Sequence, residues 1–153
     1  MAARRVCVGT HGGEVITTST STTTATDQNL PGDVPEIAVV VAVHNVEAYV
    51  AETLDSLLAQ TWPRWTCVVV DDGSTDGTVA ALTPYLADAR FRLLRQEQAG
   101  SGAARNTGLR TLDPCVPLVA FLDGDDTWEP DALTLLAEAL LADPDAVGAY
   151  GLA

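Results

Sequence analysis

Short apolar runs alternate with helical patterns along most of this chain, and the alternation limits the possible folds more than any other feature. The first run, IAVVVAV at 37–43, is continuous and β-branched, which is typical of a strand buried on both faces. The stretch 47–60 then repeats valine and leucine at helical spacing and predicts an amphipathic helix. The same succession recurs, with strands expected at 66–70, 91–95, 117–122 and from 146 onward, and helices at 76–89 (bent at Pro84), at 102–112 and after Pro130.

Strand–helix alternation at this spacing predicts an α/β fold with a mostly parallel sheet. The length of 153 residues suits one domain. Its N-terminal part differs in composition, because ITTSTSTTTATDQNLPGD at 16–33 is rich in threonine and serine and has no hydrophobic period. We interpret residues 1–34 as a disordered tail and residues 35–153 as the folded region.

The charge of the chain is strongly acidic, with 21 Asp and Glu against 8 Lys and Arg and a net charge of −13. This balance argues against a nucleic-acid partner or an anionic membrane surface, which basic faces bind. An anionic ligand would need a metal ion, a local arginine or helix N-termini to offset the field. No run of 18 apolar residues predicts a membrane span, and Cys7, Cys67 and Cys115 form neither a disulfide framework nor a zinc motif. A reducing, cytoplasmic location is expected, or one peripheral to the inner face of the membrane.

Polar residues follow three of the expected strands: His44-Asn45 after the first, DDGS at 71–74 after the second and DGDD at 123–126 after the fourth. Ligands of parallel sheets bind outside the carboxyl ends of the strands, so these segments are expected to converge on one crevice. Asp71 and Ser74 are interpreted mainly as turn-shaping residues. Asp72 is interpreted as free to accept a hydrogen bond from a ligand.

The second acidic cluster, Asp123, Asp125 and Asp126, places three carboxylates within four residues. They repel one another unless a cation lies among them, and Mg²⁺ or Mn²⁺ prefers such oxygen ligands. A solvated acidic loop is the alternative. Arg105 follows the glycine-rich GSGAA at 100–104, where it either reaches a phosphate at a helix N-terminus or forms a surface salt bridge. His44 is interpreted with equal weight as structural or as a base-contacting residue.

LDGDDT at 122–127 also fits the D-x-D-x-T nucleophile loop of haloacid-dehalogenase-type phosphatases. Asp123 would then attack phosphorus and Asp125 would act as the acid/base. That loop normally follows the first strand of its domain and is accompanied by a lysine, whereas here it follows the fourth expected strand and the chain contains no lysine. This alternative ranks below the one that follows.

Four segments in order resemble the N-terminal half of a family 2 glycosyltransferase with the GT-A fold: VVVAVHNVEAYVAETLDSLLAQT, CVVVDDGSTDGT, LLRQEQAGSGAARNTGL and VAFLDGDDTWEPDAL. The resemblance covers residues 36–153. It implies a Rossmann-like nucleotide-diphospho-sugar transferase fold and transfer of a sugar from a nucleotide donor, expected to be a UDP-sugar, to an acceptor hydroxyl with inversion. Metal assistance by Mn²⁺ or Mg²⁺ is implied as well.

The resemblance also implies roles for individual residues. The implied roles place Ala42, Val43 and His44 around the base with Glu47 nearby, Asp72 on a base N–H, Arg105 near the diphosphate, Asp123 facing the ribose or sugar, and Asp125 on the metal.

Two departures from the family pattern concern the base site, since the family usually has Pro at the position of Ala42 and often Tyr at that of His44. The general base is expected beyond Ala153, so the chain is interpreted as the donor-binding half of an incomplete domain, truncated after the metal-binding motif. Whether the acceptor is a glycan, a lipid or a protein stays open. A truncated, non-catalytic nucleotide-binding module is the alternative.

Overall fold

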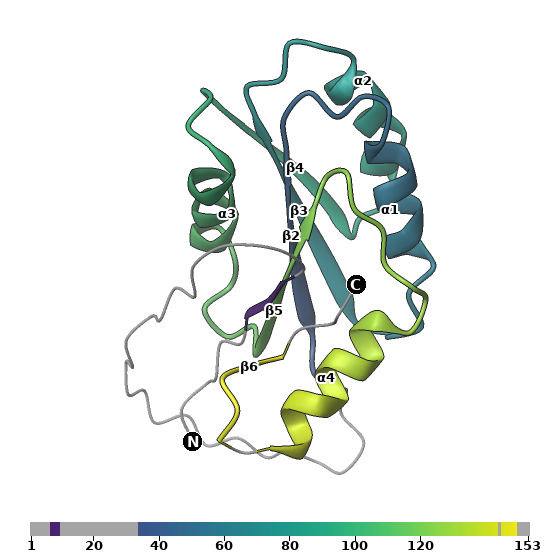
Figure 1. Ribbon diagram of the computed structural model, residues 1–153, viewed down its shortest axis with the longest axis vertical. Coiled ribbons are helices and arrows are strands. Elements are labelled where there is room, and N and C mark those ends of the chain that lie inside the picture. The colour runs from purple at the N-terminus through teal and green to yellow at the C-terminus, as the bar shows by residue number, and fades with distance from the viewer. Residues whose placement is uncertain (1–6, 10–33, 144, 150–153) are drawn as a thin grey trace.

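A parallel β-sheet forms the centre of the molecule (Figure 1). The computed structural model describes residues 7–9, 34–143 and 145–149. Within these residues the sheet has six strands in the order β4-β3-β2-β5-β1-β6, and every neighbouring pair is parallel. The strands are β1 (Cys7–Gly9), β2 (Ile37–Val43), β3 (Trp65–Asp72), β4 (Phe91–Gln96), β5 (Leu118–Asp123) and β6 (Gly148–Ala149). The α/β class and the parallel sheet predicted from the alternation are confirmed.

Helices cover the two faces of the sheet unequally. Figure 1 shows α3 on one side of the strands and α1, α2 and α4 on the other. The helical segments are α1 (Val50–Leu58), α2 (Thr78–Leu82), the 3₁₀ segment η1 (Thr83–Ala87), α3 (Ser101–Arg110) and α4 (Ala132–Ala142). α1 connects β2 to its parallel neighbour β3, and α2 with η1 connects β3 to its parallel neighbour β4. Parallel strands require crossover connections of this kind.

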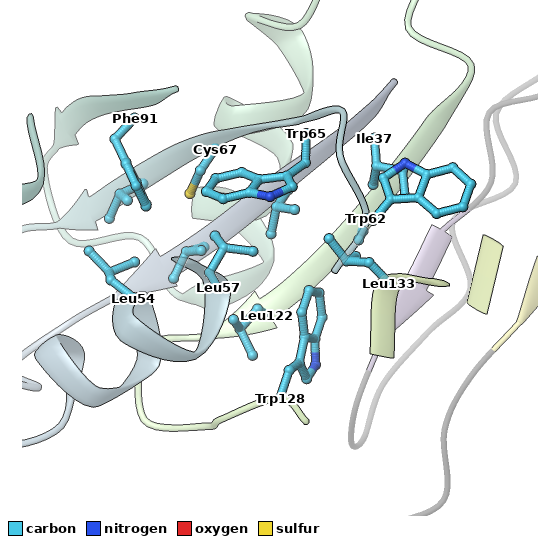
Figure 2. Packing of buried hydrophobic residues seen from close by; sticks show 14 of the residues in the cluster. Ile37, Leu54, Leu57, Trp62, Trp65, Cys67, Phe91, Leu122, Trp128 and Leu133 are labelled. Atoms are coloured by element: carbon cyan, nitrogen blue, oxygen red, sulfur yellow. The ribbon is translucent and has the colours of Figure 1, made fainter. Parts of the chain in front are cut away.

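The core lies on both faces of β2, whose seven residues are all buried. Because successive strand residues point to opposite faces, Val39 and Val41 belong to the larger apolar cluster and Val40 and Ala42 to the smaller one under α3. The larger cluster gathers Trp62, Trp65, Trp128, Phe91 and leucines of α1 and α4 (Figure 2). Cys67 is buried in this cluster, and burial raises the pKa of its thiol.

The structure differs from the sequence-based elements in two places. The helix expected at 76–89 is instead α2 followed by η1, because Pro84 lacks the N–H that an α-helix would use and lies in the first turn of the 3₁₀ segment. Cys7–Gly9 forms β1, which pairs with β5 and β6, so the expectation of disorder for residues 1–34 is wrong for these three residues. Residues 1–6 and 10–33 of that stretch lie outside the described residues.

The described helices do not include one long and apolar enough to cross a membrane. α4 is apolar along most of its length, yet it has only 11 residues, well short of the roughly 20 that a spanning helix needs.

Candidate functional site

The tips of β2, β3 and β5 lie side by side, as the strand order predicts. In the register of the sheet, Val43 pairs with Asp71 of β3, and Ala42 pairs with Asp123 of β5. The chain leaves β5 against β2, since Gly124 N donates to the Ala42 carbonyl at 3.1 Å. A Cβ on Gly124 would lie 2.6 Å from a methyl of Val43, so only glycine fits at this close approach. Both aspartate segments therefore flank the end of the central strand.

A cavity of about 60 Å³ opens at this edge of the sheet. Its lining consists of Ala42, Val43, His44, Asp72 and Ser101. Four of these five residues are among those that the family resemblance assigns to the nucleobase. Ser101, the first residue of α3, was not singled out from the sequence, although it lies in the glycine-rich segment that precedes that helix.

Asp72 is almost fully buried, with 3% of its surface exposed, and its carboxylate binds the loop between β4 and α3. Oδ1 accepts from Gln96 Nε2 at 2.7 Å and from Ala99 N at 2.9 Å, and Oδ2 accepts from Gly100 N at 2.7 Å. Burial raises the pKa of this carboxyl, but the hydrogen bonds from Ala99 N, Gln96 and Gly100 N outweigh it and hold the pKa below its ordinary value of 3.8. An ionised carboxylate has about four acceptor positions, so about one remains, on Oδ2.

His44 lies at the mouth of the same cavity and is half-buried. Its Nδ1 is 2.8 Å from the carbonyl oxygen of Asp72. Its Nε2 is 3.2 Å from Asn45 Nδ2 and 3.0 Å from Gln98 Nε2. Three polar groups thus surround the imidazole before any ligand is considered.

Glu47 is directed into the turn after β3. Its Oε2 accepts from Gly77 N at 2.9 Å, and its own backbone N donates to Asp76 Oδ2 at 3.1 Å. A Cβ on Gly77 would lie 2.5 Å from the Glu47 carboxyl carbon, which shows how closely the two segments pack. A hydrogen bond from the Thr78 hydroxyl lowers the pKa of Asp76. Glu47 does not line the cavity described above, so the structure places it in the support of the site.

Asp71 and Ser74 shape the same turn, as expected from the sequence. Asp71 Oδ1 accepts from Ser74 N at 3.0 Å, while its Oδ2 pairs with Arg95 Nε at 3.1 Å. Ser74 Oγ accepts from Asn45 N at 3.0 Å. The turns that follow β2 and β3 are therefore hydrogen-bonded to each other.

Arg105 and Asp123 form an ion pair between α3 and the tip of β5. The Arg105 side chain is 22% exposed and that of Asp123 is 28% exposed. Arg105 Nε is buried and has no hydrogen-bond partner. Among the alternatives drawn from the sequence, the arginine thus forms a salt bridge, and it does so at the ligand edge of the sheet with one donor unused.

Asp125 is exposed and makes no hydrogen bond or ion pair within the described part of the chain. No group of three or more His, Cys, Asp or Glu side chains among the described residues is arranged to hold a metal ion. A single exposed carboxylate nevertheless fits Mg²⁺ or Mn²⁺ where a substrate supplies the other ligands, since these ions are commonly bound by one or two carboxylates together with substrate phosphates. The donor set fits a metal that a diphosphate brings with it.

Gln96 and Gln98 were missed at the sequence level. Gln96 is the last residue of β4 and Gln98 lies two residues beyond it, so their position at the end of a strand was the available signal. Their partners, Asp72 and His44, lie 24 and 54 residues away along the chain, and no local pattern indicates such pairs.

Comparison with known proteins identifies the family that shares this sequence pattern. Residues 38–151 match the family described as Glycosyl transferase family 2. Glycosyltransferase GlyA of Streptococcus pneumoniae is 39% identical over 107 residues, which are 69% of this chain and 15% of GlyA. The putative teichuronic acid biosynthesis glycosyltransferase TuaG of Bacillus subtilis is 36% identical over 109 residues, which are 70% of this chain and 42% of TuaG.

Solved structures show the same fold. A TM-score of 0.62 relates the chain to S. aureus TarS 1-349 in complex with UDP-GlcNAc, at 32% identity over 70% of this chain and 31% of that one. The mannosyltransferase PcManGT of Pyrobaculum calidifontis, in complex with GDP-Man and Mn²⁺, gives 0.61 at 34% identity over 74% of this chain and 34% of that one. The chain thus spans about a third of these structures.

The match over residues 38–151 decides against the phosphatase alternative. The geometry agrees, because the carboxylate of Asp123, the nucleophile in that alternative, is paired with Arg105. The sheet order, the converging strand tips and the match across most of the sequence lead to one conclusion: the chain belongs to glycosyl transferase family 2.

Proposed function

We propose that this chain binds the donor of a glycosyltransferase that transfers a sugar from a nucleoside diphosphate to an acceptor hydroxyl. One observation carries the proposal: a cavity with an acceptor-only carboxylate, Asp72, opens at the strand tips, and the loop with the exposed carboxylate of Asp125 leaves β5 against Ala42 in the wall of that cavity. The cavity can take the polar edge of a nucleobase beside Asp72, and the neighbouring edge of the sheet suits a diphosphate with its cation. Related structures in complex with UDP-GlcNAc and with GDP-Man and Mn²⁺ support it.

In the proposed complex the polar edge of the base enters the cavity bordered by Ala42, Val43 and His44. The remaining acceptor position of Asp72 takes an N–H of the base, which suits the N3–H of uracil and makes a UDP-sugar the proposed donor. Glu47 contributes indirectly, through the turn that it holds at Gly77.

Arg105 and Asp123 lie farther along the edge, beside the proposed diphosphate and sugar. The guanidinium of Arg105 gives a charged donor for a phosphate oxygen when its ion pair with Asp123 opens. Asp125 would hold Mn²⁺ or Mg²⁺, which when bound offsets the charge of the leaving nucleoside diphosphate. Transfer with inversion to a glycan, lipid or protein hydroxyl completes the proposal for the whole protein.

The metal assignment is tested by calorimetric titration of the chain with UDP, with and without Mn²⁺. We expect Mn²⁺ to tighten UDP binding, and Asp125→Ala to abolish that gain, because the metal loses its protein ligand. Glu129→Gln is the matched control, since it removes an exposed charge from the same loop and should preserve the gain. Identical Mn²⁺-dependent binding by the wild type and Asp125→Ala would overturn the metal assignment.

The base assignment is tested with CDP, which differs from UDP where cytosine N3 accepts a hydrogen bond and uracil N3–H donates one. We expect UDP to bind at least about tenfold more tightly, because CDP leaves the Asp72 acceptor unpaired. A sugar-transfer assay with UDP-sugars then separates a transferase from a nucleotide-binding module. Binding without transfer by the whole protein would favour the module, and no binding of either nucleotide by this chain would refute the proposal.

A further inference from the structure

His44 is surrounded by hydrogen-bond partners that determine which ring nitrogen carries the hydrogen. Nδ1 lies 2.8 Å from the carbonyl oxygen of Asp72. A carbonyl oxygen can only accept, so Nδ1 must carry the hydrogen of this bond.

The other ring nitrogen faces two amide groups. Asn45 is oriented by the turn after β3, because its Oδ1 accepts from Thr75 N at 2.8 Å. Its Nδ2, a donor only, therefore points at His44 Nε2, 3.2 Å away. Gln98 Nε2 approaches the same nitrogen at 3.0 Å. Nε2 is consequently an acceptor without a hydrogen, and its lone pair is already used.

Gln98 is held where it can make this contact. A Cβ on Gly73, which has a φ of +74°, would lie only 2.9 Å from Gln98 N, so the two backbones touch. The next two residues, Ala99 and Gly100, donate their backbone N–H groups to Asp72. The backbone of this loop is thus held at Gln98 itself, by Gly73, and at the two residues after it, by Asp72.

We propose that Gln98 and Asn45 are positioning residues that hold the His44 ring in the Nδ1–H tautomer, so that the imidazole borders the base with its ring surface and gives it no hydrogen bond. The inference rests on the proposed donor site and deepens it. Of the two roles open to His44 at that site, stacking and donation, the geometry selects stacking. Asp72, whose carboxylate also lines the cavity, is then the residue that accepts a hydrogen bond from the polar edge of the base.

The tautomer is read directly from the two-bond ¹H–¹⁵N spectrum of the imidazole in ¹⁵N-labelled chain. The substitution His11→Gln leaves His44 as the single histidine, because the chain has two. We expect the Nδ1–H pattern in this background. A spectrum dominated by the Nε2–H pattern would overturn the proposal.

Two variants test the positioning. Asn45→Asp keeps the oxygen that accepts from Thr75 N and replaces the donor by an acceptor, so Nε2 is expected to take up a hydrogen. Aspartate also tolerates the left-handed backbone at this position, where φ is +53°. Gln98→Met removes a donor from an exposed residue at nearly constant length and should raise the share of the Nε2–H tautomer. Glu97→Gln, at the exposed neighbour, is the control that should leave the spectrum unchanged.

UDP titration of the same proteins connects the tautomer to the site. We expect Gln98→Met to weaken UDP binding by about twofold to tenfold, the worth of one neutral hydrogen bond, and Glu97→Gln to leave it unchanged. An unaltered tautomer ratio in both variants would refute the inference even if UDP binds. Absence of UDP binding by every protein would refute the donor site instead, while the spectra would still decide the tautomer.

Discussion

Asp72 is a buried carboxylate whose charge three hydrogen-bond donors maintain. Burial alone raises its pKa, but those donors bring the pKa below 3.8 in the folded chain. A carboxyl with a lowered folded pKa contributes stability above its unfolded pKa, and that contribution is lost as the pH falls through the folded value. The residue proposed to read the base therefore also stabilises the loop before α3.

We predict that Asp72→Asn lowers the free energy of unfolding at neutral pH by about 1–3 kcal/mol, because its NH₂ group faces backbone donors and leaves at least one of them unpaired. The difference from the wild type should narrow as the pH falls below about 4, because the carboxyl of the unfolded wild-type chain takes up a proton there before that of the folded chain does. Urea unfolding from about pH 2 to about pH 7, followed by tryptophan fluorescence, measures both effects. Asp125→Asn, at an exposed residue, should leave stability unchanged. Equal stability of Asp72→Asn and the wild type at neutral pH would contradict this account.

Single residues were predictable from the sequence where a strand tip placed them. Ala42, Val43, His44 and Asp72 line one cavity at the ends of β2 and β3. Hydrophobic periodicity predicts where those strands end, and the family resemblance assigned these four residues to the base. Their partners were not predictable, since the Asp72–Gly100 and His44–Gln98 contacts join segments 28 and 54 residues apart. Such contacts depend on how the loops close in three dimensions.

α3 packs directly on the sheet at Gly108, which lies against β2. A Cβ at this position would lie 2.4 Å from a methyl of Val40, which is fully buried. Gly102 is in the same helix, yet a Cβ there meets nothing within 4 Å. Within one helix, alanine at Gly102 would therefore change only helix propensity, whereas alanine at Gly108 would also change the packing against β2.

We predict opposite effects of alanine at these two positions. Gly108→Ala should destabilise the chain by about 1–3 kcal/mol, because overpacking a filled core outweighs the gain in helix propensity. Gly102→Ala should stabilise it by about 0.5–1 kcal/mol through the smaller entropy of the unfolded chain. Thermal or urea unfolding of both variants checks the signs. Stabilisation by Gly108→Ala would show that α3 shifts readily on the sheet.

Elements were predictable where periodicity is local and strong, as in β2, β3, β5 and α4. The helix expected at 76–89 was wrong in type over its second half, since Pro84 removes a backbone donor and shifts the chain to a 3₁₀ segment. β1 was missed because three residues carry no periodicity and their pairing with β5 is a contact across more than 100 residues.

The whole molecule carries a net charge of −13, which opposes the binding of a nucleoside diphosphate. Three arginines in the described part of the chain offset this repulsion little, because Arg90, Arg95 and Arg105 are each paired with an aspartate. A divalent cation is attracted by the same field that repels the nucleotide. The acidic composition therefore favours binding of the proposed metal at Asp125, and that metal in turn offsets the repulsion of the nucleotide.

This arrangement predicts salt effects of opposite sign. Without divalent metal, UDP binding should tighten by about twofold to fivefold as the salt concentration rises from about 0.02 to about 0.2 M, because ions screen the repulsion between two anions. With Mn²⁺ present, the same increase should weaken binding, because screening reduces the attraction of the cation to the acidic chain. Calorimetric titrations at the two salt concentrations, with a chelator and with Mn²⁺, measure both slopes. If UDP alone binds more weakly in high salt, the local charge of Arg105 outweighs the field of the whole chain, and the ion pair with Asp123 must open when the nucleotide binds.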